Sequence, residues 1–215
     1  MRTHVYIDGF NLYYRALRGT AFKWIDIVAL SKASLPSTCV ISSVNYYTAR
    51  VSGRVDPDAP KRQHAYLRAL ETLPEVTIHY GNFLTTKVWA GLVHPRDFRP
   101  ALPSALYPAP DVAYVWKTEE KGSDVNLGVH LVRDAFKGAF DGAAVLTNDT
   151  DLVEPIRIVT QEVGLPVTLL TPASKPSASL NSIATETRHV QAYLGACQLP
   201  NPVLGKKAIF KPLVW

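Results

Sequence analysis

The chain has 215 residues, of which 47% are apolar and 19% are charged, and its net charge is +5. This composition is typical of a folded globular protein and excludes a disordered chain, and no apolar run reaches the roughly 20 residues of a membrane span. Cys39 and Cys197 are far apart, which excludes a disulfide framework and a cysteine zinc site, and the N-terminus lacks the features of a secretory signal. We therefore expect a cytoplasmic protein that does not contact a membrane.

Strand and helix signals alternate along the chain. Short runs rich in Val, Ile, Thr and Tyr predict strands at 4–8, 39–49, 76–81, 112–116, 143–147 and 166–171. Helical spacing predicts helices at 10–17, 24–35, 58–73, 123–136 and 152–163. This alternation predicts an α/β fold with a mainly parallel sheet that helices cover on both faces.

Three of these elements carry the clearest patterns. In 58–73 we expect Tyr66, Leu67 and Leu70 to face the core. The helix at 123–136 has Val125, Val129, Val132 and Phe136 on one stripe. The run "AAVLT" at 143–147 has no polar alternation, which indicates a central strand buried on both sides.

Residues 1–195 are expected to form one domain, and two stretches break its pattern. Five prolines and several aromatic residues at 82–110 indicate an inserted ribbon or long loop. The tail at 196–215 is basic and contains proline. It could pack on the body, bind a partner or be loose. The basic excess lies in the first half of the chain and is compatible with a polyanionic partner, or simply with a solvated surface.

Four carboxylates stand where predicted elements meet. Asp8 ends the first strand, Asp149 and Asp151 follow "AAVLT", and Asp124 opens the helix at 123–136. Singly, each has an ordinary interpretation as a turn former, a helix cap or a partner of the helix dipole, as does Asn11. Together they would meet at one edge of a parallel sheet, where like charges repel unless a hard divalent cation is bound.

The motifs "YIDGFN", "KGSDVNLGVHL" and "VLTNDTDLVEPIRIVTQEVGLPVTLLTP" resemble, in this order, those of the NYN-domain family. This is the LabA-like branch of the PIN-like ribonuclease superfamily, and the resemblance runs from Val5 to about Thr171. It implies a PIN-like three-layer α/β/α sandwich with a mainly parallel central sheet. It also implies a Mg²⁺- or Mn²⁺-dependent ribonuclease.

By this resemblance Asp8, Asp124, Asp149 and Asp151 would hold the metal, and with Asn11 they would form the catalytic set. The residues expected to bind substrate are Arg15, Arg18, Lys121 and Asn148. Asn148 stands where relatives often have glycine, Leu152 stands where they have an aromatic residue, and His130 stands where many have a further aspartate.

The expected reaction is hydrolysis of an RNA phosphodiester by a metal-activated water, with single-stranded RNA as partner. The resemblance also implies pairing into a homodimer. A non-catalytic RNA-binding module on the same fold is the alternative. An aspartate-nucleophile phosphatase fits less well, because the second acid it needs is replaced by Phe10. No Gly-rich dinucleotide or phosphate-binding fingerprint is present.

Overall fold

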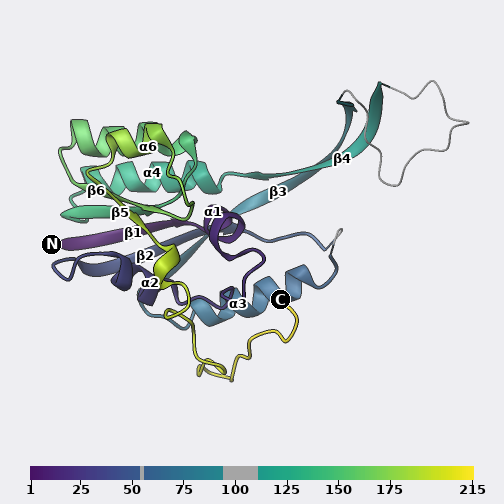
Figure 1. Ribbon diagram of the computed structural model, residues 1–215, viewed down its shortest axis with the longest axis horizontal. Helices are drawn as coiled ribbons and strands as arrows, with labels where there is room; N and C mark the ends of the chain where they lie inside the picture. Colours follow the sequence, from purple (N-terminus) through teal and green to yellow (C-terminus); the bar gives the residue numbers. More distant parts are fainter. Residues whose placement is uncertain (54–55, 94–110) are drawn as a thin grey trace, which may run out of the picture.

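A seven-stranded sheet forms the centre of the protein in the computed structural model, which describes residues 1–53, 56–93 and 111–215 (Figure 1). Its strand order is β4-β3-β2-β1-β5-β6-β7, and all neighbours are parallel except β3 and β4. The strands are β1 (Arg2–Asp8), β2 (Val40–Ala49), β3 (Val76–Gly91), β4 (Val112–Lys121), β5 (Gly142–Leu146), β6 (Val167–Thr171) and β7 (Glu186–His189). The expected mainly parallel α/β sheet is confirmed.

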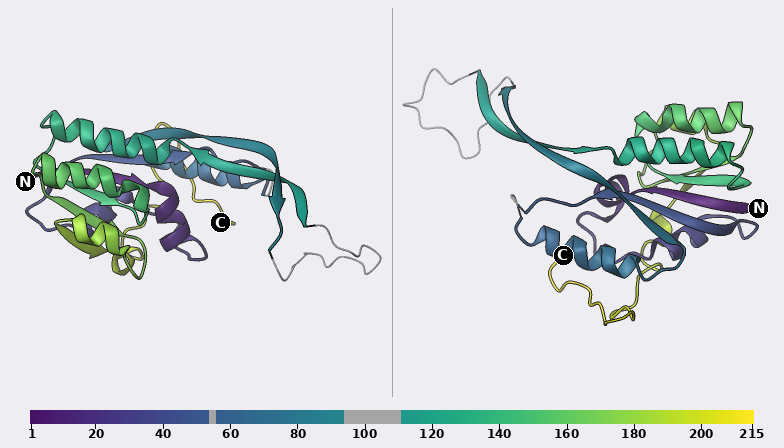
Figure 2. Two further views of the ribbon diagram at one scale, coloured as in Figure 1. Left: turned by 90° about the horizontal axis from the view of Figure 1, so that it is seen from above. Right: turned by 180° about the vertical axis from the view of Figure 1, so that it is seen from behind.

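Helices cover both faces of this sheet (Figures 1 and 2). The α-helices are α1 (Gly9–Leu12), α2 (Ile27–Ser34), α3 (Ala59–Leu70), α4 (Ser123–Phe136), α5 (Val153–Arg157) and α6 (Ala178–Ile183). Short helical segments are η1 (Tyr13–Leu17), η3 (Thr150–Leu152), η4 (Ile158–Glu162) and η5 (Gln191–Tyr193). One core packs α2 and α3 against the sheet, and the other packs α4, α5 and α6 against its opposite face.

Strand β1 shows how the sheet separates these two cores. Successive side chains of a strand point to opposite faces. Val5 and Ile7 accordingly belong to the core under α2 and α3, while Tyr6 belongs to the core under α4. All five residues of β5 are buried, so the prediction of a central strand buried on both sides is confirmed.

The five predicted helices are present, with ends that differ by a few residues. Tyr66, Leu67 and Leu70 are buried as expected. The segment 152–163 is not one regular helix but passes from η3 through α5 to η4. In α4 the buried apolar residues are Leu127, Leu131 and Ala135, so the apolar stripe that predicted this helix lies mostly outside the core.

The predicted insert contains the outer half of a two-stranded ribbon. Strand β3 continues to Gly91 instead of ending at Gly81, and its residues Asn82 to Gly91 pair antiparallel with β4. This ribbon extends away from the body (Figures 1 and 2). The remainder of the predicted insert, 94–110, lies outside the described residues.

The C-terminal segment packs on the body. Cys197, Leu199, Val203 and Ile209 are buried in the core under α2 and α3. Trp215 contacts Trp24 and Tyr66, with ring centroids 5.9 and 5.6 Å apart. Among the described helices, none is long and apolar enough to cross a membrane.

Candidate active-site crevice at the carboxyl edge of the sheet

The topology reverses between β1 and β5. From β1 the chain adds β2 and then β3 on one side, and after the ribbon it returns through α4 to place β5 on the other side of β1. Ligands of open α/β sheets bind in the crevice outside such a reversal, beyond the carboxyl ends of the strands. Asp8 is the last residue of β1, and Asp149 follows β5 by three positions.

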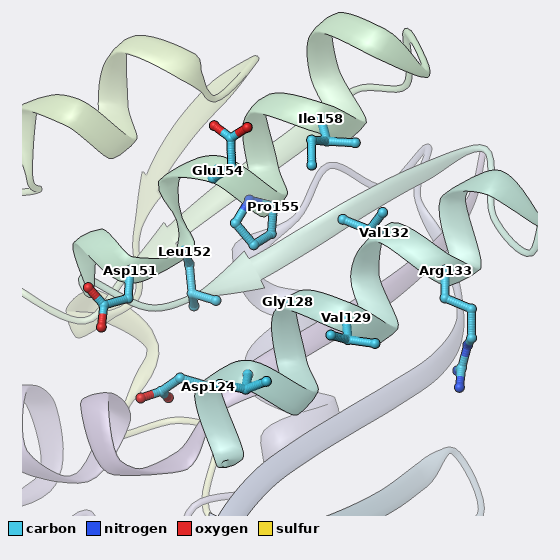
Figure 3. Close-up of a pocket in the computed structure, with 11 residues that line it drawn as sticks. Asp124, Gly128, Val129, Val132, Arg133, Asp151, Leu152, Glu154, Pro155 and Ile158 are labelled. Atoms are coloured by element: carbon cyan, nitrogen blue, oxygen red, sulfur yellow. The ribbon is translucent and has the colours of Figure 1, made fainter. Parts of the chain in front are cut away.

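A crevice of about 310 Å³ lies at this edge. Four of the five predicted catalytic residues line it, namely Asp8, Asn11, Asp124 and Asp149. Asp151 instead lines a neighbouring groove, which it shares with Asp124 (Figure 3). The predicted gathering of distant acids at one sheet edge is therefore present.

Asp8 is the buried centre of the crevice, with 2% of its surface exposed. Its Oδ1 accepts the backbone N–H of Asn11 at 2.9 Å, and its Oδ2 accepts the Asn11 side-chain amide at 2.7 Å and the Thr147 hydroxyl at 3.1 Å. Burial raises the pKa of Asp8, and the charge of Asp149 adds to this, while the three hydrogen bonds oppose the shift. Both carboxylate oxygens are thus committed to protein donors.

The loop after β5 is built from its own polar groups. Thr147 accepts the backbone N–H of Asp149 at 3.0 Å, and Asp149 in turn caps the next turn by accepting the backbone N–H of Asp151 at 3.1 Å. Asn148 accepts the backbone N–H of Ser177 at 2.8 Å, and its own N–H donates to Asn11 at 3.3 Å. These bonds fix the loop against the first helix and against the segment before α6.

Asp124 is the carboxyl whose protonation the crevice perturbs most clearly. Burial, and to a smaller extent the charges of Asp8, Glu120, Asp149 and Asp151, together raise its pKa to about 7. Among the described residues, none of the four predicted aspartates forms an ion pair with Lys or Arg. Near neutral pH this crevice therefore holds a carboxyl that can give or take a proton.

Aromatic rings form part of the wall of the crevice. Phe10, Tyr14 and Phe83 line it. Phe10 stacks on Tyr14 at 6.4 Å and meets Phe83 edge-on at 5.6 Å. The crevice thus combines an apolar, ring-lined side with an acidic side, which suits a flat aromatic ligand carrying polar substituents.

The residues predicted to bind substrate occupy different places. Asn148 reaches the crevice loop, and Arg15 donates from Nε to Asn11 Oδ1 at 3.3 Å. Arg18 lies over the ring of Tyr14 at 5.6 Å, and Lys121 pairs with Glu119 at 3.3 Å. Neither Arg18 nor Lys121 lines the crevice.

Sequence reasoning missed several residues of this site. Glu120 and Phe83 belong to the ribbon strands, whose pairing brings them face to face. Glu120 also accepts the backbone N–H of Ser123 at 3.0 Å, which starts α4. Phe10 and Thr147 lie inside two of the motifs quoted above. A large apolar side chain and a hydroxyl next to the acids were the signals that could have identified them. Phe83 gave no signal, because the strand was predicted to end at Gly81.

The described part of the chain does not bring the four aspartates predicted to hold a metal ion into one group. Among the described residues, no group of three or more His, Cys, Asp and Glu side chains is placed to hold a metal ion. The oxygens of Asp8 accept hydrogen bonds from Asn11 and Thr147, and Asp151 lies in the neighbouring groove. His130, at the variant position of the second motif, pairs with Tyr47 at 3.0 Å and lies outside the crevice lining.

The fold and this crevice define an α/β protein with a candidate ligand site at the reversal of an open, mainly parallel sheet. No family model matches the chain. A solved Vibrio parahaemolyticus protein of unknown function superimposes with a TM-score of 0.51 over 87% of this chain and 91% of its own, at 17% identity. That similarity concerns the fold alone.

A curated relative identifies the family. The chain is 31% identical over 247 aligned residues to the 6-hydroxy-3-succinoylpyridine 3-monooxygenase HspA of Pseudomonas putida (strain DSM 28022 / S16). The match covers 100% of this chain and 75% of that protein. The chain belongs to the family of this monooxygenase.

This relationship corrects the expected activity. We expected a Mg²⁺- or Mn²⁺-dependent ribonuclease, or an RNA-binding module on the same fold. The relative is named for an oxygenation, not for phosphodiester hydrolysis, so the nuclease and hydrolase assignments are wrong. The expected magnesium or manganese cofactor is wrong with them.

Proposed function

We propose that the protein is a monooxygenase that hydroxylates a substituted pyridine or a closely related aromatic ring in the crevice between β1 and β5. The observation that carries this proposal is the 31% identity to HspA along the whole of this chain. The composition of the crevice supports it, because three aromatic side chains line it together with the acids.

The reaction class sets what the site must do. One atom of O₂ enters the substrate and forms a new C–O bond, while the other leaves as water with two protons. Two electrons must come from a donor such as a reduced nicotinamide or a reduced flavin, so O₂ and this donor are co-substrates of the proposed reaction.

Asp124 is the proposed proton-transfer group. Its pKa of about 7 makes both of its protonation states available near neutral pH. In its ionised form it would take the proton of a ring hydroxyl, which enriches the ring in electrons and favours attack on oxygen. Phe10 and Phe83 would hold the ring by stacking, and Asp8 would position Asn11 without touching the substrate.

The turn after β1 does not fit the pyrophosphate of a dinucleotide. In dinucleotide-binding sheets this turn is rich in glycine, so the backbone can approach the phosphates at the start of the helix. Here Asp8 places a carboxylate at the start of α1, which spans four residues. A Cβ on Gly9 would lie 2.7 Å from the Tyr46 ring and from the Tyr47 carbonyl, so this glycine serves packing against β2. The electron donor is therefore not a dinucleotide seated at this turn.

We keep the resemblance to NYN domains as a proposal about the fold and not about the activity. We propose the PIN-like form of the three-layer sandwich for this chain, on the order of its three motifs. One fold supports unrelated chemistries, and function follows from the residues of the site. The acidic sheet edge is compatible with a proton-transfer role, because protein donors hold Asp8 and Asp149 while Asp124 has a pKa of about 7.

The test uses the purified full chain with 6-hydroxy-3-succinoylpyridine, ¹⁸O₂ and NADH, with and without added flavin. We expect a product that carries one ¹⁸O atom, detected by mass spectrometry, and substrate loss coupled to NADH oxidation. Asp124→Asn is expected to lower kcat at least tenfold, while the matched surface change Asp58→Asn leaves it unchanged. Absence of ¹⁸O from every product, with the donor supplied in each form, would overturn the proposal.

A further inference from the structure

Helix α4 has an apolar face that turns away from the core. Val125, Val129 and Phe136 are 67%, 58% and 66% exposed. The other side of the same helix buries Leu127, Leu131 and Ala135 against the sheet. A helix that borders solvent is normally polar on its outer side, and a contiguous apolar patch there marks an interaction surface.

A groove between α4 and α5 continues this apolar face. Its volume is about 560 Å³, and Figure 3 shows Val129, Val132, Leu152, Pro155 and Ile158 around it. Its floor is closed, because a Cβ on Gly128 would come within 2.8 Å of the Pro155 ring. The stripe of α4 and the groove therefore form one apolar surface over two helices.

Opposite charges stand at the two ends of this surface. Asp124 and Asp151 lie at the end where α4 begins, whereas Glu154 lies across the groove on α5 and pairs with Arg157 at 2.5 Å. Arg133 and Lys137 are exposed at the end where α4 finishes, and Arg133 pairs there with Asp134 at 2.7 Å, so Lys137 carries the excess positive charge. A helix of 14 residues is about 20 Å long, so the two charged ends are well separated.

We propose that this surface is the interface of a homodimer, in which α4 packs antiparallel against α4 of a second copy. A two-fold axis through the middle of the helix places the acidic end of each copy over the basic end of the other. The surface is thus complementary to itself in charge, and the antiparallel order also aligns the helix dipoles favourably. The valines and Phe136 of both copies would be buried between them.

The dimer would complete the crevice electrostatically. Asp124 lies at the acidic end of the interface and also lines the crevice. In the antiparallel arrangement Arg133 of the partner subunit approaches this end. It would bring a cation, already paired with Asp134 of its own chain, close to Asp124.

The test is the molar mass of the purified chain by size-exclusion chromatography with light scattering, from about 1 to 100 μM. We expect the mass of a dimer for the wild type. Val129→Glu and Phe136→Glu should each raise the dimer dissociation constant at least 100-fold, with an unchanged far-ultraviolet circular dichroism spectrum. Leu213→Glu, at an apolar residue that is fully exposed in the tail, is the matched control and should stay dimeric.

Charge reversal tests the antiparallel order. Arg133→Glu should weaken the dimer about tenfold or more, and adding Asp151→Lys should restore part of the affinity. A monomeric wild type at 100 μM overturns the proposal, as does a dimer that persists in both glutamate variants. If one of the two variants, Val129→Glu or Phe136→Glu, misfolds, the dissociation constant of the other variant tests the interface. These measurements contain no substrate, so their result is independent of the proposed monooxygenase activity.

Discussion

Asn11 binds both carboxylate oxygens of Asp8, through its backbone N–H at 2.9 Å and through its side-chain amide at 2.7 Å. Asp8 thereby caps α1 and fixes the direction in which the chain leaves β1. The pair explains why an aspartate and an asparagine three residues apart end a buried strand here. Turn chemistry, which the sequence offered as the ordinary interpretation, accounts for both residues.

Replacing Asp8 with alanine should destabilise the fold. The change removes three hydrogen bonds and leaves the Asn11 amide and the Thr147 hydroxyl without their acceptor in a buried site. Loss of a cap costs about 1 kcal/mol, and each buried donor left unpaired costs about 1–3 kcal/mol. We expect the free energy of unfolding to fall by about 2–4 kcal/mol, measured by urea denaturation.

Asp58→Ala is the control for this prediction. Asp58 precedes α3 without a side-chain capping bond, and its exposed carboxylate pairs with the exposed Lys61. Exposed pairs of this kind contribute about 0–1 kcal/mol, so the control should change stability little. Equal losses in the two variants would show that the Asp8 network contributes nothing beyond an ordinary surface acid.

Gly9→Ala should be destabilising through packing alone. A Cβ at this position would lie 2.7 Å from the Tyr46 ring and from the Tyr47 carbonyl oxygen, and the backbone atom cannot move freely. Overpacking of this kind costs about 1–3 kcal/mol, which should appear as a lower urea midpoint. Gly91→Ala, with open space around its Cβ, should leave the midpoint nearly unchanged. A midpoint for Gly9→Ala as high as that of Gly91→Ala would contradict the close approach of α1 to β2.

The protonation of Asp124 should make stability fall as the pH rises from about 4 to 7. Its folded-state pKa is raised to about 7 from the unfolded value of 3.8, so the native state binds the proton more tightly in this window. Its contribution is therefore present at low pH and lost as the pH passes 7. After allowance for its partial exposure we expect about 1–2 kcal/mol.

The measurement compares the wild type with Asp124→Asn by urea denaturation between pH 4 and pH 9. The variant has no proton to lose, so its advantage over the wild type should grow up to about pH 7 and then remain constant. Asp58→Asn, at an exposed carboxylate, serves as the control. Its free energy of unfolding should differ from that of the wild type by the same amount at every pH. Parallel curves for wild type and Asp124→Asn would show that the crevice does not perturb this carboxyl.

The periodicity of the sequence predicted most of the fold. Six of the seven strands and all five predicted helices lie where the patterns place them, because the core between the layers selects apolar residues at the matching spacing. Strands β3 and β4 run beyond their predicted ends, to Gly91 and Lys121, and β7 was missed because its four residues, ETRH, are polar and lie at the sheet edge. Helix α4 shows the limit of the method: the stripe of Val125 and Val129 predicts a helix but not that this side faces outward.

The site was only partly predictable, for a different reason. Junction acids predicted the sheet edge correctly, since chain topology alone brings Asp8, Asp124 and Asp149 together. What the acids do depends on which donors occupy their oxygens, and Thr147 reaches Asp8 across 139 positions. The aromatic wall depends on the ribbon register that places Phe83 opposite Glu120, and no local pattern encodes that register.

Phe83 should control the affinity for the substrate ring if the crevice is the oxygenation site. The ring lines the crevice and meets Phe10 edge-on at 5.6 Å, so Phe83→Leu removes a stacking surface while keeping the position apolar. An aromatic contact contributes about 0.5–1.5 kcal/mol beyond its buried area, so KM for 6-hydroxy-3-succinoylpyridine should rise about 3- to 10-fold with kcat changed less than 3-fold. Leu84→Ala is the matched control, since Leu84 is the next residue of β3, 53% exposed and on the opposite face of the ribbon, and its KM should equal that of the wild type. An unchanged KM in Phe83→Leu, or an equal rise in both variants, would place the ring of the substrate somewhere other than against this wall.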